Sequence, residues 1–71
     1  MYKHYYINNN QTSNPGIHHE IHTKEHAAQL GIRSTQYVDY YANEVETVAQ
    51  AKKIYSDAEG CAICCPDAHR G

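Results

Sequence analysis

The chain contains no tryptophan and no phenylalanine, and tyrosine, present seven times, supplies all of its aromatic bulk. Tyrosine needs a partner for its hydroxyl group, so a core built on it is shallow. A chain of 71 residues also buries too little surface to be more than marginally stable. Small domains of this kind commonly gain stability from a metal, from disulfides or from a partner subunit. The candidate core residues are few: Ile7, Ile17, Ile21, Leu30, Ile32, Val38, Val45, Val48 and Ile54.

Three further absences restrict the function. No apolar run approaches the roughly 20 residues of a membrane span, so no membrane partner is expected. No cluster of lysine and arginine forms an electrostatic footprint for nucleic acid, and the formal net charge is −2. Residues 1–6 lack the apolar core of a signal peptide, which predicts a cytoplasmic protein. No small-molecule substrate is evident.

The three cysteines are an odd number and lie close together, at Cys61, Cys64 and Cys65. This is a poor framework for disulfides, and cytosolic thiols stay reduced. Closely spaced reduced cysteines favour metal binding or redox chemistry.

Turn signals and strand-forming residues divide the chain into a few short elements of one domain, 1–71. Asn14-Pro15-Gly16 predicts a turn between two strands, and the tyrosine-rich segment before Asn43 predicts a third. Asn43 is a good N-cap with Glu46 three residues later, and Gly60 provides a stop after the helix. The predicted elements are a hairpin over 2–23, a third strand over 36–42, a helix over 44–57 and a knuckle over 60–66.

These elements predict an α+β fold, in which a small antiparallel three-stranded sheet packs on one C-terminal helix and ends in a C-x-x-C knuckle. Between the hairpin and the third strand the sequence is irregular. Glu25 to Leu30 suits one short helical turn before Gly31.

Two short motifs point to a metal. His22-x-x-x-His26 follows a predicted strand, and Cys61-x-x-Cys64 follows the predicted helix. Two imidazoles and two thiolates form the N₂S₂ set typical of structural zinc. We therefore predict that His22, His26, Cys61 and Cys64 hold a zinc ion; two surface histidines and two small buried cysteines are the alternative interpretation.

Strand geometry leaves the choice of histidine open. In a regular strand over 17–23, His22 shares a face with His18 and Glu20, whereas Ile21 and His19 share the opposite one. His22 then leaves the core side unless the strand bends there, and His19 is the substitute ligand. Two further second-choice ligands are Cys65, within the knuckle, and His69, after it. Glu20 is a poor candidate for a general base beside a catalytic metal, because metalloprotease motifs with a glutamate between histidines require a helix and this segment is a predicted strand.

The order of these motifs resembles the Ada-type zinc-binding domain of DNA methylphosphotriester repair proteins. The resemblance covers residues 17–66 and rests on His22 to His26, Tyr37 to Asn43, Glu46 to Tyr55, and Gly60 to Cys64. The chain also resembles short uncharacterised bacterial proteins with a His-Glu-Val-His-x-x-x-Cys segment and a Gly-Cys-x-x-Cys end. These resemblances imply a zinc-binding fold. They do not imply methyl transfer, because the family's ligands are cysteines where this chain has His22 and His26.

The prediction from sequence is a non-catalytic zinc module that acts through an unidentified protein or nucleic acid. Four protein ligands close the site, so no enzyme activity is expected. One alternative is a thiol redox or metal-handling protein that uses Cys61, Cys64 and Cys65. Another is a metal-free small fold that is stabilised as a homodimer through an exposed edge strand.

Overall fold

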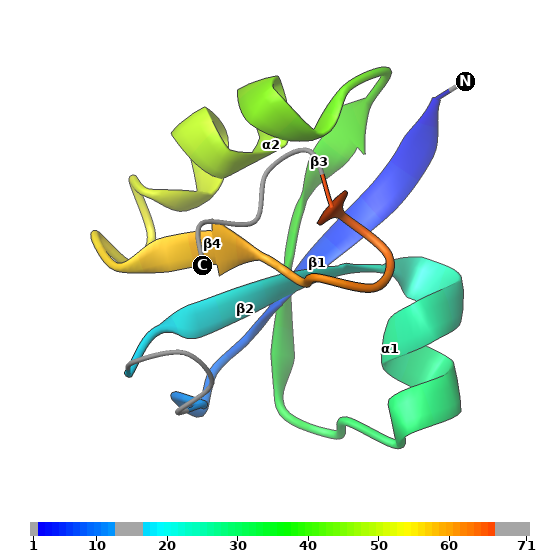
Figure 1. The fold of residues 1–71 in the computed structure, drawn as a ribbon, viewed down its shortest axis with the longest axis vertical. Helices are drawn as coiled ribbons and strands as arrows, with labels where there is room; N and C mark the ends of the chain where they lie inside the picture. The colour runs from blue at the N-terminus through cyan, green and yellow to red at the C-terminus, as the bar shows by residue number, and fades with distance from the viewer. Residues whose placement is uncertain (1, 13–16, 67–71) are drawn as a thin grey trace.

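The computed structural model describes residues 2–12 and 17–66. Along the chain lie β1 (Lys3–Asn8), β2 (His19–Thr23), α1 (Lys24–Leu30), β3 (Thr35–Tyr41), α2 (Glu44–Ala51) and β4 (Ala58–Gly60). The strands form one sheet in the order β3-β1-β2-β4, with both helices visible in Figure 1. β1 pairs antiparallel with β2 and β3, whereas β2 and β4 run parallel. The architecture is therefore α+β with a mixed sheet.

The predicted three-stranded antiparallel sheet with one helix is wrong in two respects. The sheet has a fourth strand, β4, which pairs in parallel with β2. Its sequence, Ala-Glu-Gly, contains no residue that favours strands, so only the pairing with β2 creates it. The second difference is α1, a second helix of seven residues between β2 and β3, where only one short helical turn over Glu25 to Leu30 was expected.

Local capping explains α1. The Thr23 side chain accepts a hydrogen bond from the backbone N–H of His26, which satisfies a free donor of the first turn. At the other end Gly31 adopts a left-handed conformation with φ of 69°, and its N–H returns to the helix carbonyls. Glycine takes this conformation without strain, so it ends the helix after Leu30.

α2 begins as the sequence predicts but ends at Ala51 rather than at residue 57. Asn43 accepts a hydrogen bond from the N–H of Glu46 at 2.8 Å, as a capping residue does. After Ala51 the chain continues through tight turns, in which the N–H groups of Ile54 and Tyr55 bind the Ala51 carbonyl. The turns shorten the helix and lead the chain directly into β4.

The core lies between the sheet and α2 and is small. Its buried members are Tyr5, Ile7, Ile21, Ala51, Ala58 and Cys65. Only two large aliphatic side chains, Ile7 and Ile21, are fully buried in the described part of the chain. Four other aliphatic residues expected in the core are instead exposed: Ile17, Leu30, Val45 and Ile54. Alanine, cysteine and tyrosine fill the space that larger side chains occupy in bigger domains.

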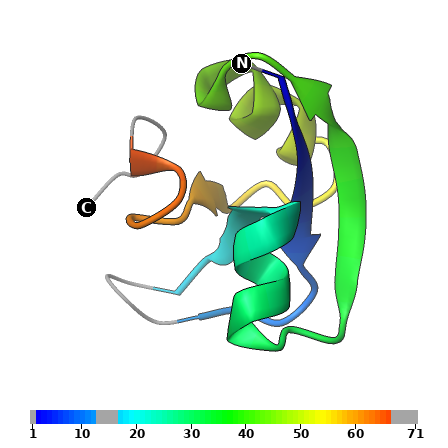
Figure 2. The same ribbon diagram turned by 90° about the vertical axis from the view of Figure 1, so that its right-hand side faces the viewer.

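The outer face of β1 and β3 carries aromatic rings. Tyr2 and Tyr40 lie beside each other with ring centroids 5.3 Å apart, and His4 lies 4.5 Å from Tyr40. Figure 2 shows β3 on the opposite side of the molecule from the segment after β4. No described helix has the length and hydropathy needed to cross a membrane.

Candidate metal centre

The two histidines of the first motif lie on either side of a strand-to-helix junction. His22 is in β2, and His26 is in the first turn of α1. Thr23 between them ends the strand and caps the helix, so the chain turns sharply there. Their rings face the same region, with centroids 5.4 Å apart. The capping of α1 therefore positions one candidate ligand relative to the other.

The two cysteines of the second motif follow β4. The N–H of Cys61 donates to the carbonyl of Ile21, which continues the parallel pairing of β2 and β4 by one bond. The N–H of Cys65 then donates to the Cys61 carbonyl at 2.8 Å and closes a turn over 61–65. This turn is the knuckle, and the unexpected parallel pairing is what places it beside His22.

The structure brings His22, His26, Cys61 and Cys64 together. One ligand atom from each lies within 4.8 Å of all the others. Cys61 Sγ is 3.7 Å from His26 Nδ1, and Cys64 Sγ is 3.8 Å from His22 Nδ1. A tetrahedral zinc ion with bonds of about 2.3 Å to sulfur and about 2.0 Å to nitrogen separates these atoms by about 3.5 Å. The four groups thus surround a volume that fits such an ion after small adjustments.

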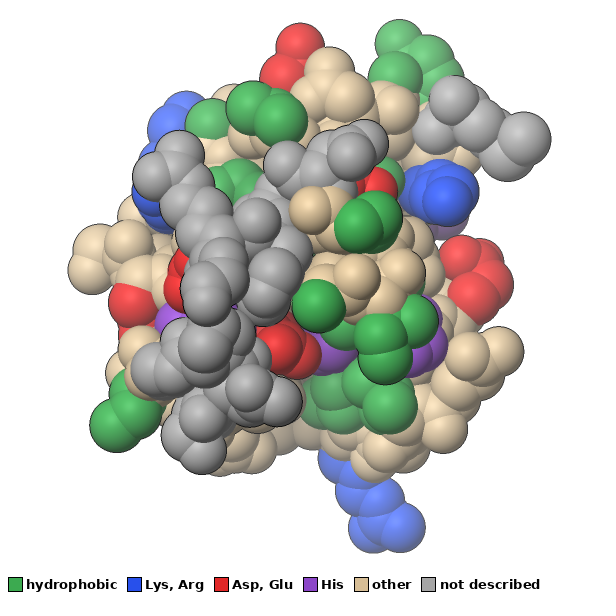
Figure 3. Space-filling model, in the orientation of Figure 1, with side chains coloured by type: hydrophobic (Ala, Val, Ile, Leu, Met, Phe, Trp, Pro, Cys, Tyr) green, Lys and Arg blue, Asp and Glu red, His purple; other side chains and the backbone are tan. Residues whose placement is uncertain are grey.

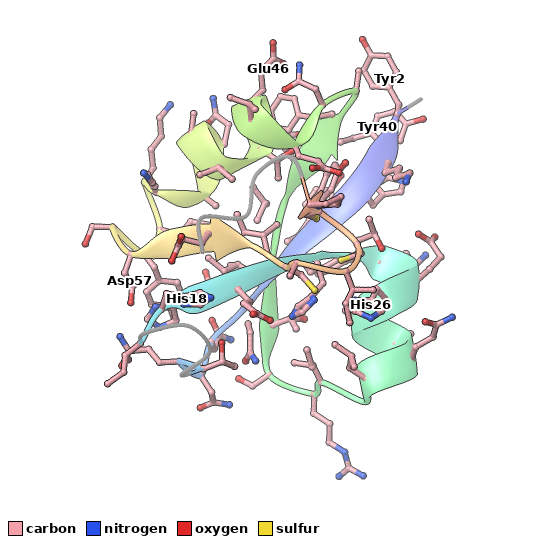
Figure 4. All side chains as sticks on the ribbon, viewed as in Figure 1. Tyr2, His18, His26, Tyr40, Glu46 and Asp57 are labelled. Carbon is pink, nitrogen blue, oxygen red and sulfur yellow. The ribbon has the colours of Figure 1, made fainter. Side chains whose placement is uncertain are left out.

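The site is buried on one side and open on the other. His22 and Cys61 are buried, whereas His26 and Cys64 are half-buried. Figure 4 shows His26 at the start of α1, beside the segment that carries the sulfur atoms. In Figure 3, histidine side chains lie next to apolar and acidic ones on this face. A metal ion would therefore be shielded without being sealed from solvent.

The thiols of the knuckle differ in their ionisation. Burial raises the pKa of Cys61. At Cys64, a hydrogen bond from the Cys65 thiol lowers the pKa, and His22 lowers it further. The pKa of Cys65 is raised, first because it donates that hydrogen bond and then because it is buried. Cys64 is therefore the thiol most readily present as the thiolate that binds metal.

Two of the second-choice ligands, Cys65 and His19, are not in the four-residue group. Cys65 is buried in the apolar core, with its sulfur 3.7 Å from that of Cys64. His19 bonds to Asp57 at 2.5 Å and stacks on Tyr55, with ring centroids 3.7 Å apart. His19 therefore has other partners and is not in the four-residue group. His69 lies outside the described residues.

The structure shows how His22 is buried on the face of β2 opposite Ile21. Ile21 and His22 are only 1% exposed, although side chains of adjacent strand residues point to opposite faces. Both faces of β2 are therefore covered at this point. Ile21 faces the apolar core, and His22 faces the knuckle.

Two glutamates and one histidine that lie near the site, Glu20, Glu59 and His18, were not among the predicted ligands. Glu20 lies 3.4 Å from the Nε2 atom of His22, and His18 contacts both Glu20 and Glu59. The alternation of side chains along β2 and the residue before it indicates that His18, Glu20 and His22 share a face. No sequence pattern indicates that Glu59 lies near the site, because its position depends on the parallel pairing of β4 with β2.

Comparison of the chain with protein-family models, with curated proteins and with solved structures found no match. The resemblance to the Ada-type domain consequently remains a prediction from the motifs.

Proposed function

We propose that this protein is a small zinc-binding module whose metal is structural. The observation that carries the proposal is the convergence of His22, His26, Cys61 and Cys64, with ligand atoms within 4.8 Å of one another. These residues come from distant parts of the sequence and meet at one point of the fold. Sulfur and imidazole nitrogen in equal number favour zinc among the common divalent ions.

The metal would join α1 and the end of β2 to the knuckle, in addition to the pairing of β2 with β4. His22 and His26 belong to β2 and α1, whereas Cys61 and Cys64 follow β4. With only two large aliphatic side chains fully buried among the described residues, the core contributes little stability. Metal binding would then supply much of the folding free energy, as in other small zinc domains.

Four protein ligands fill a tetrahedral site and leave no position for a water or substrate. The module is therefore proposed to be non-catalytic and to act by contact with a protein or nucleic acid. Free cysteines in the described chain suit a reducing compartment, so we place it in the cytoplasm. The Ada-type resemblance agrees with a zinc module but not with methyl transfer.

Native mass spectrometry tests the proposal. The protein purified with zinc is expected to carry one zinc ion per chain, and a strong chelator is expected to remove it. Alanine substitution of His22, His26, Cys61 or Cys64 should abolish binding at stoichiometric zinc. His4→Ala is the matched control, because His4 is exposed on β1 and lies outside the group. A wild-type chain that takes up no zinc contradicts the proposal.

One observation favours a second candidate, a thiol redox protein. The Cys64 and Cys65 sulfurs lie 3.7 Å apart, and the hydrogen bond between them lowers the pKa of Cys64. Unlike redox motifs, however, this thiol does not begin a helix, where the helix dipole stabilises a thiolate. Alkylation rates distinguish the two: a zinc site protects Cys61 and Cys64, whereas a redox thiol reacts rapidly whether or not zinc is present.

A further inference from the structure

A row of charged and imidazole side chains extends from the metal site along β2. His18, Glu20 and His22 occupy alternate positions of the chain, and Glu59 of β4 is the register partner of Glu20. Glu20 Oε1 lies 3.4 Å from His22 Nε2, and Glu20 Oε2 lies 3.5 Å from His18 Nε2. The remaining ring nitrogen of His18, Nδ1, lies 3.5 Å from Glu59 Oε2.

The two ring nitrogens of His22 therefore face different partners. Nδ1 lies 3.8 Å from Cys64 Sγ, on the side of the candidate metal, and Nε2 faces the Glu20 carboxylate. A neutral imidazole carries one proton, and the nitrogen that binds a metal carries none. If Nδ1 binds the metal, the proton is on Nε2, which faces the Glu20 carboxylate at 3.4 Å.

The carboxylate of Glu20 lies close to the rings of both His18 and His22. Like charges directly opposite each other on paired strands are unfavourable, and Glu20 and Glu59 are such a pair. The ring of His18 contacts both carboxylates and is only 2% exposed. Figure 4 shows His18 at the end of β2 away from His26. His18 thus lies between the two carboxylates, with one ring nitrogen 3.5 Å from each.

His26 provides a contrast within the same site. Its Nδ1 atom lies 3.7 Å from Cys61 Sγ, but no carboxylate of the described residues lies within ion-pair distance of its ring. It is also more exposed than His22. The two histidine ligands therefore differ in how firmly the protein orients them.

We propose that Glu20 is a positioning residue of the metal centre, which fixes the His22 ring so that Nδ1, and not Nε2, binds the metal. This inference rests on the proposed zinc site and adds the partner that orients one ligand. A carboxylate behind a metal-binding histidine fixes the tautomer and the orientation of the ring. Loss of such a partner typically lowers metal affinity by about 10- to 100-fold.

Zinc affinity is the first test, measured by competition with a chromophoric chelator. Glu20→Ala is expected to weaken binding about 10- to 100-fold. Glu20→Gln keeps an oxygen that accepts a hydrogen bond from Nε2, so it should recover most of that loss. Glu46→Gln is the matched control, because Glu46 is exposed on α2, far from the site in Figure 4. Wild-type affinity in Glu20→Ala overturns the inference, whereas absence of zinc binding in the wild type contradicts the proposed function instead.

The second test is a long-range ¹H–¹⁵N spectrum of the imidazole nitrogens in the zinc-bound protein. It is expected to show His22 with the proton on Nε2 and zinc on Nδ1. In Glu20→Ala the His22 pattern should change, while the His26 pattern stays as in the wild type. A role in folding alone would lower the stability of the metal-free protein and leave the tautomer of His22 unchanged. Zinc on Nε2 of His22 in the wild type overturns the inference, even where the alanine variant does not fold.

Discussion

Withdrawal of the proposed zinc ion is the perturbation to which this fold is expected to be most sensitive. The Cys61–His26 and Cys64–His22 contacts join residues 35 and 42 positions apart in the sequence. A cross-link over loops of this length lowers the entropy of the unfolded chain by the equivalent of about 4 kcal/mol. This is of the order of the whole stability of a small domain, which is about 0.05–0.15 kcal/mol per residue.

The stabilisation expected from zinc binding by mass action is of similar size. Free zinc at about 1,000 times its dissociation constant stabilises the folded state by about 4 kcal/mol. For a domain of this size, each kcal/mol raises the midpoint of thermal unfolding by about 4–8 °C. We therefore expect the midpoint in buffered zinc to exceed that in excess chelator by about 16–32 °C.

Circular dichroism during thermal unfolding measures this difference directly. The protein is unfolded in a zinc buffer, in chelator, and in chelator followed by an excess of zinc, which should restore the higher midpoint. A Cys61→Ser, Cys64→Ser double variant is the control and should unfold at one temperature in all three solutions. Equal midpoints for the wild-type protein with zinc and with chelator would refute the argument, because no cross-link of this length could then be present.

Three other predictions concern residues outside the ligand set. Gly31→Ala should lower the free energy of unfolding by about 1–2 kcal/mol in urea titration, because Gly31 has a φ of 69° although its surroundings leave room for a methyl group. Ile21→Ala should lower the free energy of unfolding by about 2–5 kcal/mol in the same assay, since Ile21 is one of two fully buried large aliphatic residues in the described part of the chain. The variant should therefore be unfolded without metal under conditions in which the metal-free wild-type protein is still folded. Partial burial raises the pKa of Asp57, but hydrogen bonds from Gln11 and His19 outweigh it and lower the pKa overall. Asp57→Asn should therefore cost about 0.5–1 kcal/mol at pH 7, and this cost should disappear as the pH falls below the folded pKa of Asp57 and its carboxylate is protonated in the wild type.

The sequence predicts the parts of the fold that depend on local signals. Asn43 marks the start of α2 because its side chain accepts from a nearby N–H, and Thr35–Tyr41 is rich in residues that favour strands. β4 cannot be predicted from local signals. Its three residues form a strand only because β2 lies beside them, and no short-range pattern records that pairing.

For the candidate site, the spacing of the motifs is informative but the direction of each side chain is not. His22-x-x-x-His26 and Cys61-x-x-Cys64 are visible in the sequence, and the structure brings them together. The buried position of His22 depends on a knuckle that covers the second face of β2, which the strand pattern alone does not reveal. Contacts such as Glu20 with His22 follow from alternation along one strand, whereas Glu59 requires the tertiary fold.

The order of the strands has a consequence for how the chain is made. β1 and β2 are the two central strands of the sheet and are synthesised first, so each later strand adds to an edge that already exists. β3 joins the free edge of β1, and β4 then joins that of β2. Cys61 and Cys64 leave the ribosome after all four strands, because synthesis proceeds from the N-terminus. Of the four ligands of the proposed zinc site, the two cysteines are therefore the last to become available, after His22 and His26.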